Sequence, residues 1–422
     1  AEAMRTACPD LVGERPEIFA HHCYAGGLVE DAINAWAEAA RRALARSANV
    51  EALGHLDKAI AALSEVQDAR RAVELELDLL IAKGSAHIAL EGYAASPVER
   101  CYGRAREICS QLDFAAKLSP VLRGLQSFYQ VRGPMETARE LAQQLLQLAE
   151  AENGPPILVQ AHRRLGWCMF CLGEFDGARE HLERAITLYD RDQTAEHLAR
   201  YGADPAVIGL INVAWLDWYA GRTEQAIARR DRAIKLGREI AHPLSLAYAL
   251  CMGAAVAQAI GDVETVLADA TETLAVAEDR GFSYWIAWAT ALKGWAIAAQ
   301  GRREDGLLLL EDGLMQYHAT GSELFVPHCR MLMADILARA GRWSETKDAL
   351  DQAEAAAQRI QVRFILTELL WRRAEVLANC DEVDTALEWL EQAIALARKQ
   401  GAAGIERLAT AELDRLKRRM AS

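Results

Sequence analysis

Apolar residues recur along most of the chain with the three- and four-residue spacing of amphipathic α-helices, and the helices come in pairs. The pattern is clearest in residues 161–189, where it predicts two helices joined by a tight turn at Gly173. Gly166 on the first helix and Ala178 on the second carry little or no side chain. We therefore expect their backbones to approach more closely than the usual distance of about 8–10 Å. A hairpin of this kind cannot bury its apolar faces alone, so the pattern predicts stacked copies of it.

The small residue at Ala178 has equivalents along the whole chain, and six of the eight intervals between them are 40 residues long. The equivalents are Ala52, Val98, Ala138, Ala178, Ala226, Val266, Gly306, Thr346 and Ala386. This period predicts nine helical hairpins, near residues 29–66, 70–113, 118–151, 157–190, 205–240, 243–280, 283–320, 323–360 and 363–400. A last helix at 404–420 is expected to form a polar cap. Residues 1–15 have no clear period and are expected to be an N-terminal arm or linker, so the predicted solenoid spans 16–422.

The hairpin at 161–189 resembles the tetratricopeptide repeat (TPR). The resemblance rests on Leu165, Gly166, Gly173, Phe175, Ala178, Leu182 and Ala185. It implies an all-α fold, a right-handed TPR-like α-solenoid of about nine hairpins with a C-terminal capping helix. The turns of the fourth to eighth hairpins carry Gly173, Gly221, Gly261, Gly301 and Gly341, whereas the ninth has Cys380-Asp381 and is expected to be looser.

A second resemblance covers almost the whole chain. Residues 19–27, 32–36 and 46–52 resemble the junction at which a maltose-regulator-type TPR-like arm leaves the ATPase module of bacterial signalling ATPases. Residues 92–132 and 165–190 also resemble that group. In bacterial proteins that join a class III adenylate/guanylate cyclase domain to a predicted ATPase, this arm forms the C-terminal third. The resemblance implies an upstream nucleotide-binding module in the same polypeptide. Met4 after Ala1-Glu2-Ala3 agrees with a chain excised from a longer protein.

Composition narrows the choice of partners and compartment. The formal net charge of −13 disfavours a general attraction to nucleic acid or to an anionic membrane. The nine cysteines have no framework spacing, which is typical of reduced thiols in a cytoplasmic protein. The uncharged run 240–261 is long enough to span a membrane, but its His242, Pro243 and turn signal at Gly261 favour a buried helix.

The sequence carries no motif for catalysis. GxxxxGK[ST], HExxH and GxSxG are absent, so we expect no catalytic residues and no cofactor in this chain. Cys168 and Cys171 form a single CxxC pair on one helix, and His21 and His22 are adjacent on another. Because a zinc site needs four ligands, both pairs are expected to have structural roles, and no metal is predicted.

Aromatic residues form the most informative pattern. TPR proteins usually bind ligands through the first helix of each hairpin, on the face that lines a concave groove. In this chain that face carries Trp167, Phe170, Trp215, Trp218, Tyr219, Tyr248, Trp288 and Trp295, with Gln160, Arg163, Arg123 and Lys83 at its basic end. An aromatic floor bordered by arginine suits a protein or peptide partner, or a small anionic effector with an apolar body. The alternative is that these side chains simply fill the interior.

The long interval of 48 residues places eight extra residues between Thr187 and Asp204, with His197, Arg200 and Tyr201 among the residues of that segment. Such insertions often border a binding face, although a loop without function explains it nearly as well. The function expected from all of this is a non-catalytic regulatory arm that binds an effector and signals to an ATPase or cyclase module. The alternatives are a passive assembly scaffold, or a fragment of an enzyme known by its parent's activity.

Overall fold

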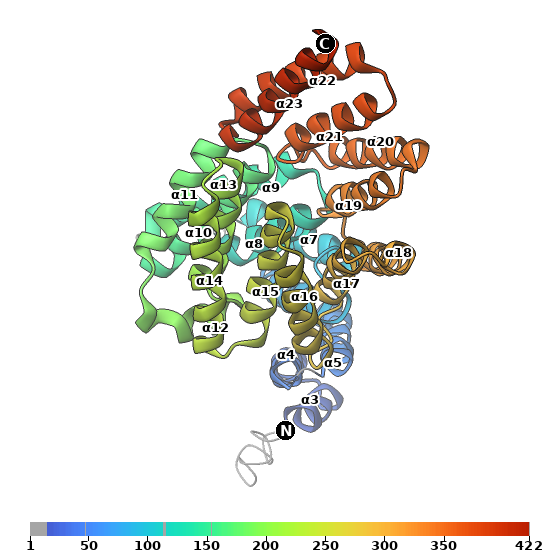
Figure 1. Ribbon diagram of the computed structural model, residues 1–422. Coiled ribbons are helices and arrows are strands. Elements are labelled where there is room, and N and C mark those ends of the chain that lie inside the picture. The colour runs from blue at the N-terminus through green and yellow to red at the C-terminus, as the bar shows by residue number, and fades with distance from the viewer. Residues whose placement is uncertain (1–14, 47, 113–114, 153, 422) are drawn as a thin grey trace. The chain divides into compact units, whose positions relative to one another are not determined.

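The computed structural model describes residues 15–46, 48–112, 115–152 and 154–421. Within these residues every regular element is helical, with 21 α-helices, two short 3-10 helices and no strand (Figure 1). The predicted all-α solenoid of stacked hairpins is therefore confirmed. Residues 1–14 of the predicted N-terminal arm lie outside the described residues. The chain divides into two compact units between Val131 and Arg132, inside the predicted repeat 118–151.

Unit 1 contains the N-terminal helices. They are α3 (Pro16–Ala25), α4 (Val29–Ala45), α5 (Asn49–Ala62), the 3-10 helix η1 (Leu63–Glu65), α6 (Ala69–Glu91), α7 (Ser96–Leu112) and most of α8 (Ala115–Arg132). Phe19, Trp36 and Leu56 are buried together between α3, α4 and α5. The ring of Tyr102 on α7 occupies the space that a Cβ on Gly84 or Gly124 would need. Glycines on α6 and α8 thus let both helices close around one tyrosine.

Unit 2 contains six complete hairpins, a helix before them and a helix after them. The hairpins are α10 (Pro155–Cys171) with α11 (Phe175–Leu188), α13 (Pro205–Tyr219) with α14 (Thr223–Ile240), α15 (Pro243–Ile260) with α16 (Val263–Glu278), α17 (Ser283–Ala299) with α18 (Arg303–Ala319), α19 (Val326–Arg339) with α20 (Trp343–Arg359), and α21 (Leu366–Asn379) with α22 (Val383–Gln400). The flanking helices are α9 (Met135–Glu152) and α23 (Ala403–Ala421). Successive first helices, from α13 through α15 and α17 to α19, contact one another and form the inner layer of the unit.

Local sequence signals account for the helix ends. Gly221 and Gly261 end first helices with φ of 74° and 89°, a left-handed conformation that glycine adopts without strain. Asp381 takes the same place in the last hairpin with φ of 61°, and the Glu382 N–H donates to Leu377 O as in the glycine turns. The prediction of a looser ninth turn is therefore wrong, because a short polar side chain tolerates the left-handed region.

Small residues set the helix spacing, as the sequence predicts. A Cβ on Gly166 would lie 3.0 Å from the carbonyl oxygen of Ala178, well inside van der Waals contact. The backbones of α10 and α11 can approach this closely only because Gly166 has no side chain.

Within unit 2 the last repeats return to contact the first ones. The Met135 N–H donates to Ile360 O at 2.9 Å, and the Arg363 N–H donates to Cys171 O at 2.7 Å. Further along, the Arg407 guanidinium donates to Gly221 O at 3.0 Å. The loop that enters α21 and the first turns of α23 therefore lie against the turns of earlier hairpins, which encloses the inner layer of unit 2.

One helix of the described chain, α15, is long and apolar enough to cross a membrane by length and composition. In this structure 67% of its apolar window is buried inside the protein. It forms part of the inner layer between α13 and α17.

Candidate binding site

The predicted aromatic residues come together inside unit 2. Trp167 and Phe170 lie on α10, Trp215, Trp218 and Tyr219 on α13, Tyr248 on α15, and Trp288 and Trp295 on α17. The ring centroids of Trp167 and Trp215 are 6.4 Å apart, and those of Trp215 and Trp288 are 6.5 Å apart. All of these side chains except Tyr248, which is partly exposed, are at most 9% exposed. In this conformation they pack on one another instead of presenting a floor to solvent, and their role in binding stays a prediction.

Two phenylalanines from loops complete this aromatic cluster. Phe325, just before α19, stacks on Trp288 with centroids 3.6 Å apart and planes 8° apart. Phe364, just before α21, stacks on Phe170 with centroids 4.9 Å apart. Sequence reasoning missed both because they lie outside the helices, although their separation of 39 residues is close to the repeat period.

The four polar residues predicted for the same site lie in two different units of the structure. Gln160 and Arg163 lie one turn apart on α10, where the Arg163 Nε donates to Gln160 Oε1 at 3.2 Å, and both are buried. Arg123 and Lys83 belong to unit 1, where Arg123 is half-buried and Lys83 pairs with Asp57 at 2.6 Å. The structure therefore brings Gln160 and Arg163, but not Arg123 and Lys83, into one unit with the tryptophans.

The insertion forms η2 (Arg191–Gln193) and α12 (Thr194–Tyr201). His197 is fully buried, with its ring centroid 5.9 Å from that of Tyr189. The Tyr189 hydroxyl donates to the buried carboxylate of Asp204 at 2.8 Å. The side chain of Arg200 lies outside the described residues. The insertion is thus a packed element of unit 2, anchored at the start of α13.

The inner layer changes character along unit 2. One repeat position carries Trp295, Asp335, Glu375 and Arg415, each 40 residues after the last. A second carries Tyr248, Trp288, His328 and Glu368 with the same spacing. At the first position Trp295 on α17 is followed by charged residues from α19 onward, and at the second Tyr248 and Trp288 are followed by His328 and then Glu368. This switch at a constant period is the sequence signal that identifies the polar residues of the last repeats.

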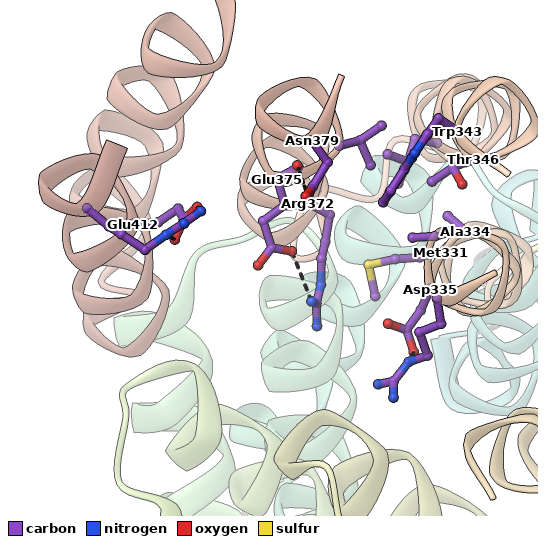
Figure 2. Close-up of a pocket in the computed structure, with 14 residues that line it drawn as sticks. Met331, Ala334, Asp335, Trp343, Thr346, Arg372, Glu375, Asn379 and Glu412 are labelled. Carbon is purple, nitrogen blue, oxygen red and sulfur yellow. Dashed lines mark hydrogen bonds and ion pairs between the residues drawn. The ribbon is translucent and has the colours of Figure 1, made fainter. Parts of the chain in front are cut away.

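A cavity of about 330 Å³ opens where the charged residues begin. We call it the C-terminal pocket; it is lined by Met331, Ala334, Asp335, Ala338, Arg339, Trp343, Thr346, Leu350, Arg372, Glu375, Val376, Asn379, Glu412 and Arg415. Figure 2 shows Arg372 and Glu375 between Glu412 on one side and Asp335 on the other. Trp343 and Met331 supply an apolar wall. The size is at the lower end of the range of small-ligand sites.

Ion pairs hold the charged side chains of this pocket in place. The Trp295 indole N–H donates to Asp335 Oδ2 at 2.7 Å, and Arg339 Nε donates to the same oxygen at 3.0 Å. Arg372 donates to Glu375 Oε2 at 3.1 Å (Figure 2). Asp335 therefore joins the aromatic cluster to the C-terminal pocket.

Beside the pocket, Glu368 is 4% exposed on the first turn of α21. Burial raises the pKa of Glu368 to about 7, and the nearby Arg372 guanidinium only partly offsets this effect. Burial also raises the pKa of Glu375 above its ordinary value. Burial alone would lower the pKa of Arg372, but the surrounding carboxylates, Glu368 foremost, raise it. The pocket therefore presents a fixed guanidinium beside carboxyl groups that gain protons easily.

The CxxC pair belongs to no metal cluster within the described residues. Cys168 and Cys171 are fully buried thiols outside any disulfide, and burial raises the pKa of Cys171 well above its ordinary value. His21 and His22 are both exposed near the end of α3, which excludes the core alternative of the expected capped or core role. Within the described residues no three or more His, Cys, Asp or Glu side chains are arranged to hold a metal ion.

Stacked two-helix hairpins with a 40-residue period define a helical-repeat protein of the TPR type. Consistent with this class, the family model of the tetratricopeptide repeat matches residues 121–191. The chain is also 25% identical over 394 residues to an uncharacterized protein of Rhizobium meliloti (strain 1021). That alignment covers 92% of this chain and 38% of the relative, so the chain spans about two fifths of the length of the curated relative it matches.

Two solved structures are similar to this chain at low sequence identity, and one of them has a TM-score above 0.5. A Rap protein complexed with Competence and Sporulation Factor is 12% identical with a TM-score of 0.56, covering 92% of this chain and 98% of that chain. NprR in complex with its cognate peptide NprX is 14% identical with a TM-score of 0.48, covering 80% of this chain and 98% of that chain. At these identities the likeness concerns the fold alone.

Proposed function

We propose that the chain is a non-catalytic recognition arm that binds a short peptide, or a small effector of similar chemistry, in the C-terminal pocket. The observation that carries this proposal is the change of the inner layer from aromatic to charged at α19, where the cavity lies. Partial burial of charged side chains costs folding free energy unless every charge is paired, so unpaired charges at such a place indicate a binding role. Here Arg415 is still 57% exposed and Arg339 51% exposed, so each can take a second partner.

The chemistry of the lining favours a peptide over a simple anion. Arginine donates to carboxylates with two parallel hydrogen bonds, which suits a peptide C-terminus or an acidic side chain. Glu375 and Asp335 accept from ammonium groups and backbone N–H groups, and Trp343 provides apolar area. A ligand with both charges and an apolar side chain matches all three features. The fold shared with a Rap protein complexed with Competence and Sporulation Factor supports this ligand class.

The aromatic cluster would act as a rigid support, so that ligand binding in the pocket changes how the repeats are arranged. The Trp295 indole N–H donates to Asp335 in the pocket wall. A ligand that binds the Asp335 carboxylate would therefore change the position of the Trp295 side chain. Binding would then favour one arrangement of the repeats over another, since a ligand shifts an equilibrium by its difference in affinity for the two states. The predicted aromatic groove becomes a binding surface only if the contacts between early and late repeats open.

Calorimetric titration of the chain with a pool of short synthetic peptides carrying free termini tests the pocket. Binding peptides should lose about tenfold or more of their affinity in Arg415→Ala, because one charge-assisted contact is removed. The matched control is Arg303→Ala, an exposed arginine of α18 distant in sequence from the pocket lining. Unchanged affinity in Arg415→Ala and in Arg372→Lys would place the site elsewhere, and concentration-dependent mass in light scattering without peptide would favour an assembly scaffold.

We further propose that the arm controls a nucleotide-handling module, an ATPase or cyclase, in the same cytoplasmic polypeptide. The resemblance of residues 19–52 to an ATPase–arm junction supports this, as does a relative more than twice as long as the aligned region. The test is the nucleotide turnover of the full gene product with and without the binding peptide. A peptide-dependent rate that Arg415→Ala abolishes is expected; equal rates would exclude the coupling.

A further inference from the structure

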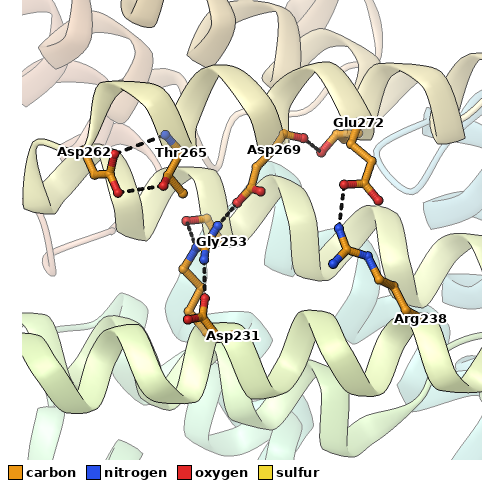
Figure 3. A network of polar contacts seen from close by, with 9 residues as sticks. Asp231, Arg238, Gly253, Asp262, Thr265, Asp269 and Glu272 are labelled. Carbon is orange, nitrogen blue, oxygen red and sulfur yellow. Dashed lines mark hydrogen bonds and ion pairs between the residues drawn. The ribbon is translucent and has the colours of Figure 1, made fainter.

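The basic residues of α14 are divided between two sides of the helix. On one side Arg230 donates to Gly253 O at 3.2 Å and pairs with Asp231 and with Asp269 of α16 (Figure 3). Arg238 pairs with Glu272 of α16 at 2.7 Å (Figure 3). These arginines are therefore committed to the contact between α14 and α16.

On the side facing α11, the first half of α14 is also neutralised. Arg229 contacts Asp217 at 2.9 Å and Glu183 at 2.7 Å. Arg179 and Arg222 contact the same Asp217 carboxylate, which is fully buried, at 3.0 and 3.2 Å. Three arginines therefore share the Asp217 carboxylate of α13, and Arg229 also pairs with Glu183 of α11.

The second half of this side is different. A cavity of about 420 Å³, which we call the α11–α14 pocket, is lined by Ile186, Tyr189, Arg191, Ala206, Leu210, Arg232, Lys235, Leu236 and Glu239. Arg191, from the insertion, pairs with Glu239 at 3.0 Å. Across the described residues, Arg232 and Lys235 have no carboxylate within ion-pair distance, and both side chains are exposed.

The α11–α14 pocket therefore combines an apolar wall with two unmatched cations on a chain whose formal charge is −13. The wall is formed by the partly exposed Ile186 and Leu236 with the Tyr189 ring, whereas Leu210 is buried. Nucleic acid binding normally uses a broad basic field, which two exposed cations on an acidic chain do not provide. A negatively charged ligand with an aliphatic or aromatic side group fits better, since it satisfies the cations and covers the apolar wall.

We propose that the α11–α14 pocket docks an acidic segment of a protein partner. One bulky apolar side chain of the segment enters between Ile186 and Leu236, and flanking carboxylates contact Arg232 and Lys235. The eight-residue insertion contributes Arg191 to this pocket and so builds one edge of the docking surface. This second interface goes beyond the proposed function, because it shares no residue with the C-terminal pocket.

The probe is a fluorescein-labelled synthetic peptide of alternating glutamate and leucine pairs, titrated with the full chain by fluorescence anisotropy. Saturable binding is expected at low salt, weakening as the ionic strength rises. The variant Arg232→Glu/Lys235→Glu should bind at least about tenfold more weakly, because both attractive contacts become repulsive. The matched control Arg303→Glu/Lys399→Glu changes the net charge equally at exposed residues outside the pocket and should keep nearly full affinity.

Four results would overturn the proposal. No saturable binding of the probe, or an equal loss in both double variants, would mean that the pocket does not hold the peptide. Equal binding of a peptide with serine in place of leucine would exclude the apolar contact. Full competition by a single-stranded oligonucleotide would mean that Arg232 and Lys235 bind phosphate groups instead of carboxylates. The variant Arg415→Ala should bind the probe normally, so failure here and failure at the C-terminal pocket are distinguishable.

Discussion

The helices α17 and α18 cross so closely that the structure predicts the effect of adding a single methyl group between them. A Cβ on Gly294 would lie 2.6 Å from both Gly306 O and Leu310 N, which are backbone atoms and cannot rotate away. The ordinary contact distance for such atoms is at least about 3.4 Å, so Gly294→Ala must move the helices apart by several tenths of an ångström. Because α17 carries Trp288 and Trp295, this movement would also loosen the aromatic cluster.

The expected cost of Gly294→Ala is about 1–3 kcal/mol, as for other overpacked interiors. Alanine is also a better helix former than glycine, which returns about 1 kcal/mol. Gly237→Ala on α14 isolates this second effect, since its Cβ would meet only ordinary contacts, the nearest at 3.4 Å from Leu246 Cα. We therefore expect Gly237→Ala to be neutral or slightly stabilising and Gly294→Ala to be about 1–3 kcal/mol less stable than Gly237→Ala.

The measurement is thermal and urea unfolding of both variants beside the unaltered chain, followed by circular dichroism of the helices and by tryptophan fluorescence. For a unit of this size each kcal/mol corresponds to about 2–4 °C, so Gly294→Ala should lower the midpoint by several degrees relative to Gly237→Ala. Equal midpoints for the two variants would refute the reasoning. That result would mean that α17 and α18 separate without cost and that their close approach does not stabilise unit 2.

Three further substitutions test the interior of unit 2. Because burial raises the pKa of Glu368 from 4.5 to about 7, the folded state holds this proton more tightly than the unfolded state, and stability should fall as the pH rises through that window. Glu368→Gln should remove this fall, with a gain of up to about 3 kcal/mol near pH 8 and little change near pH 5 in urea unfolding. Arg230→Leu should cost about 3–5 kcal/mol by leaving Asp269 unpaired, and adding Asp269→Leu should recover most of that loss in the same assay. Trp288→Ala should cost about 3–5 kcal/mol in thermal unfolding, because its ring is fully buried on Phe325, and intact stability would instead favour a binding role.

The helices were predictable because their signals are local. A small residue at each hairpin crossing and a glycine in the turn, as at Gly166 and Gly261, act within a few residues of the structure they determine. The gathering of Trp167, Trp215 and Trp288 was also predictable, because Trp167 and Trp215 share one repeat position and Trp288 lies two helical turns before that position on α17.

The burial of those tryptophans was not predictable, because it depends on contacts between distant repeats. Phe325 and Phe364 reach the interior from loops, and the Met135–Ile360 and Arg407–Gly221 contacts that enclose it join residues about two hundred positions apart. No period along the chain encodes how tightly the repeats curl. The C-terminal pocket, in contrast, had a signal in the change from Trp295 to Asp335 at a constant spacing.

The change from Trp295 to Asp335 follows from the hydrogen-bond and charge requirements of these side chains. A buried indole N–H needs an acceptor, and Asp335 provides one to Trp295 at 2.7 Å. A carboxylate in that position needs a cation, which Arg339 supplies from the same helix. Each of these charges requires a further partner or water. The next residues at this repeat position, Glu375 and Arg415, are therefore also charged, and they line an open cavity. A ligand that replaces water there competes for the charges that hold Trp295, so binding in the pocket would act on α17 through this hydrogen bond.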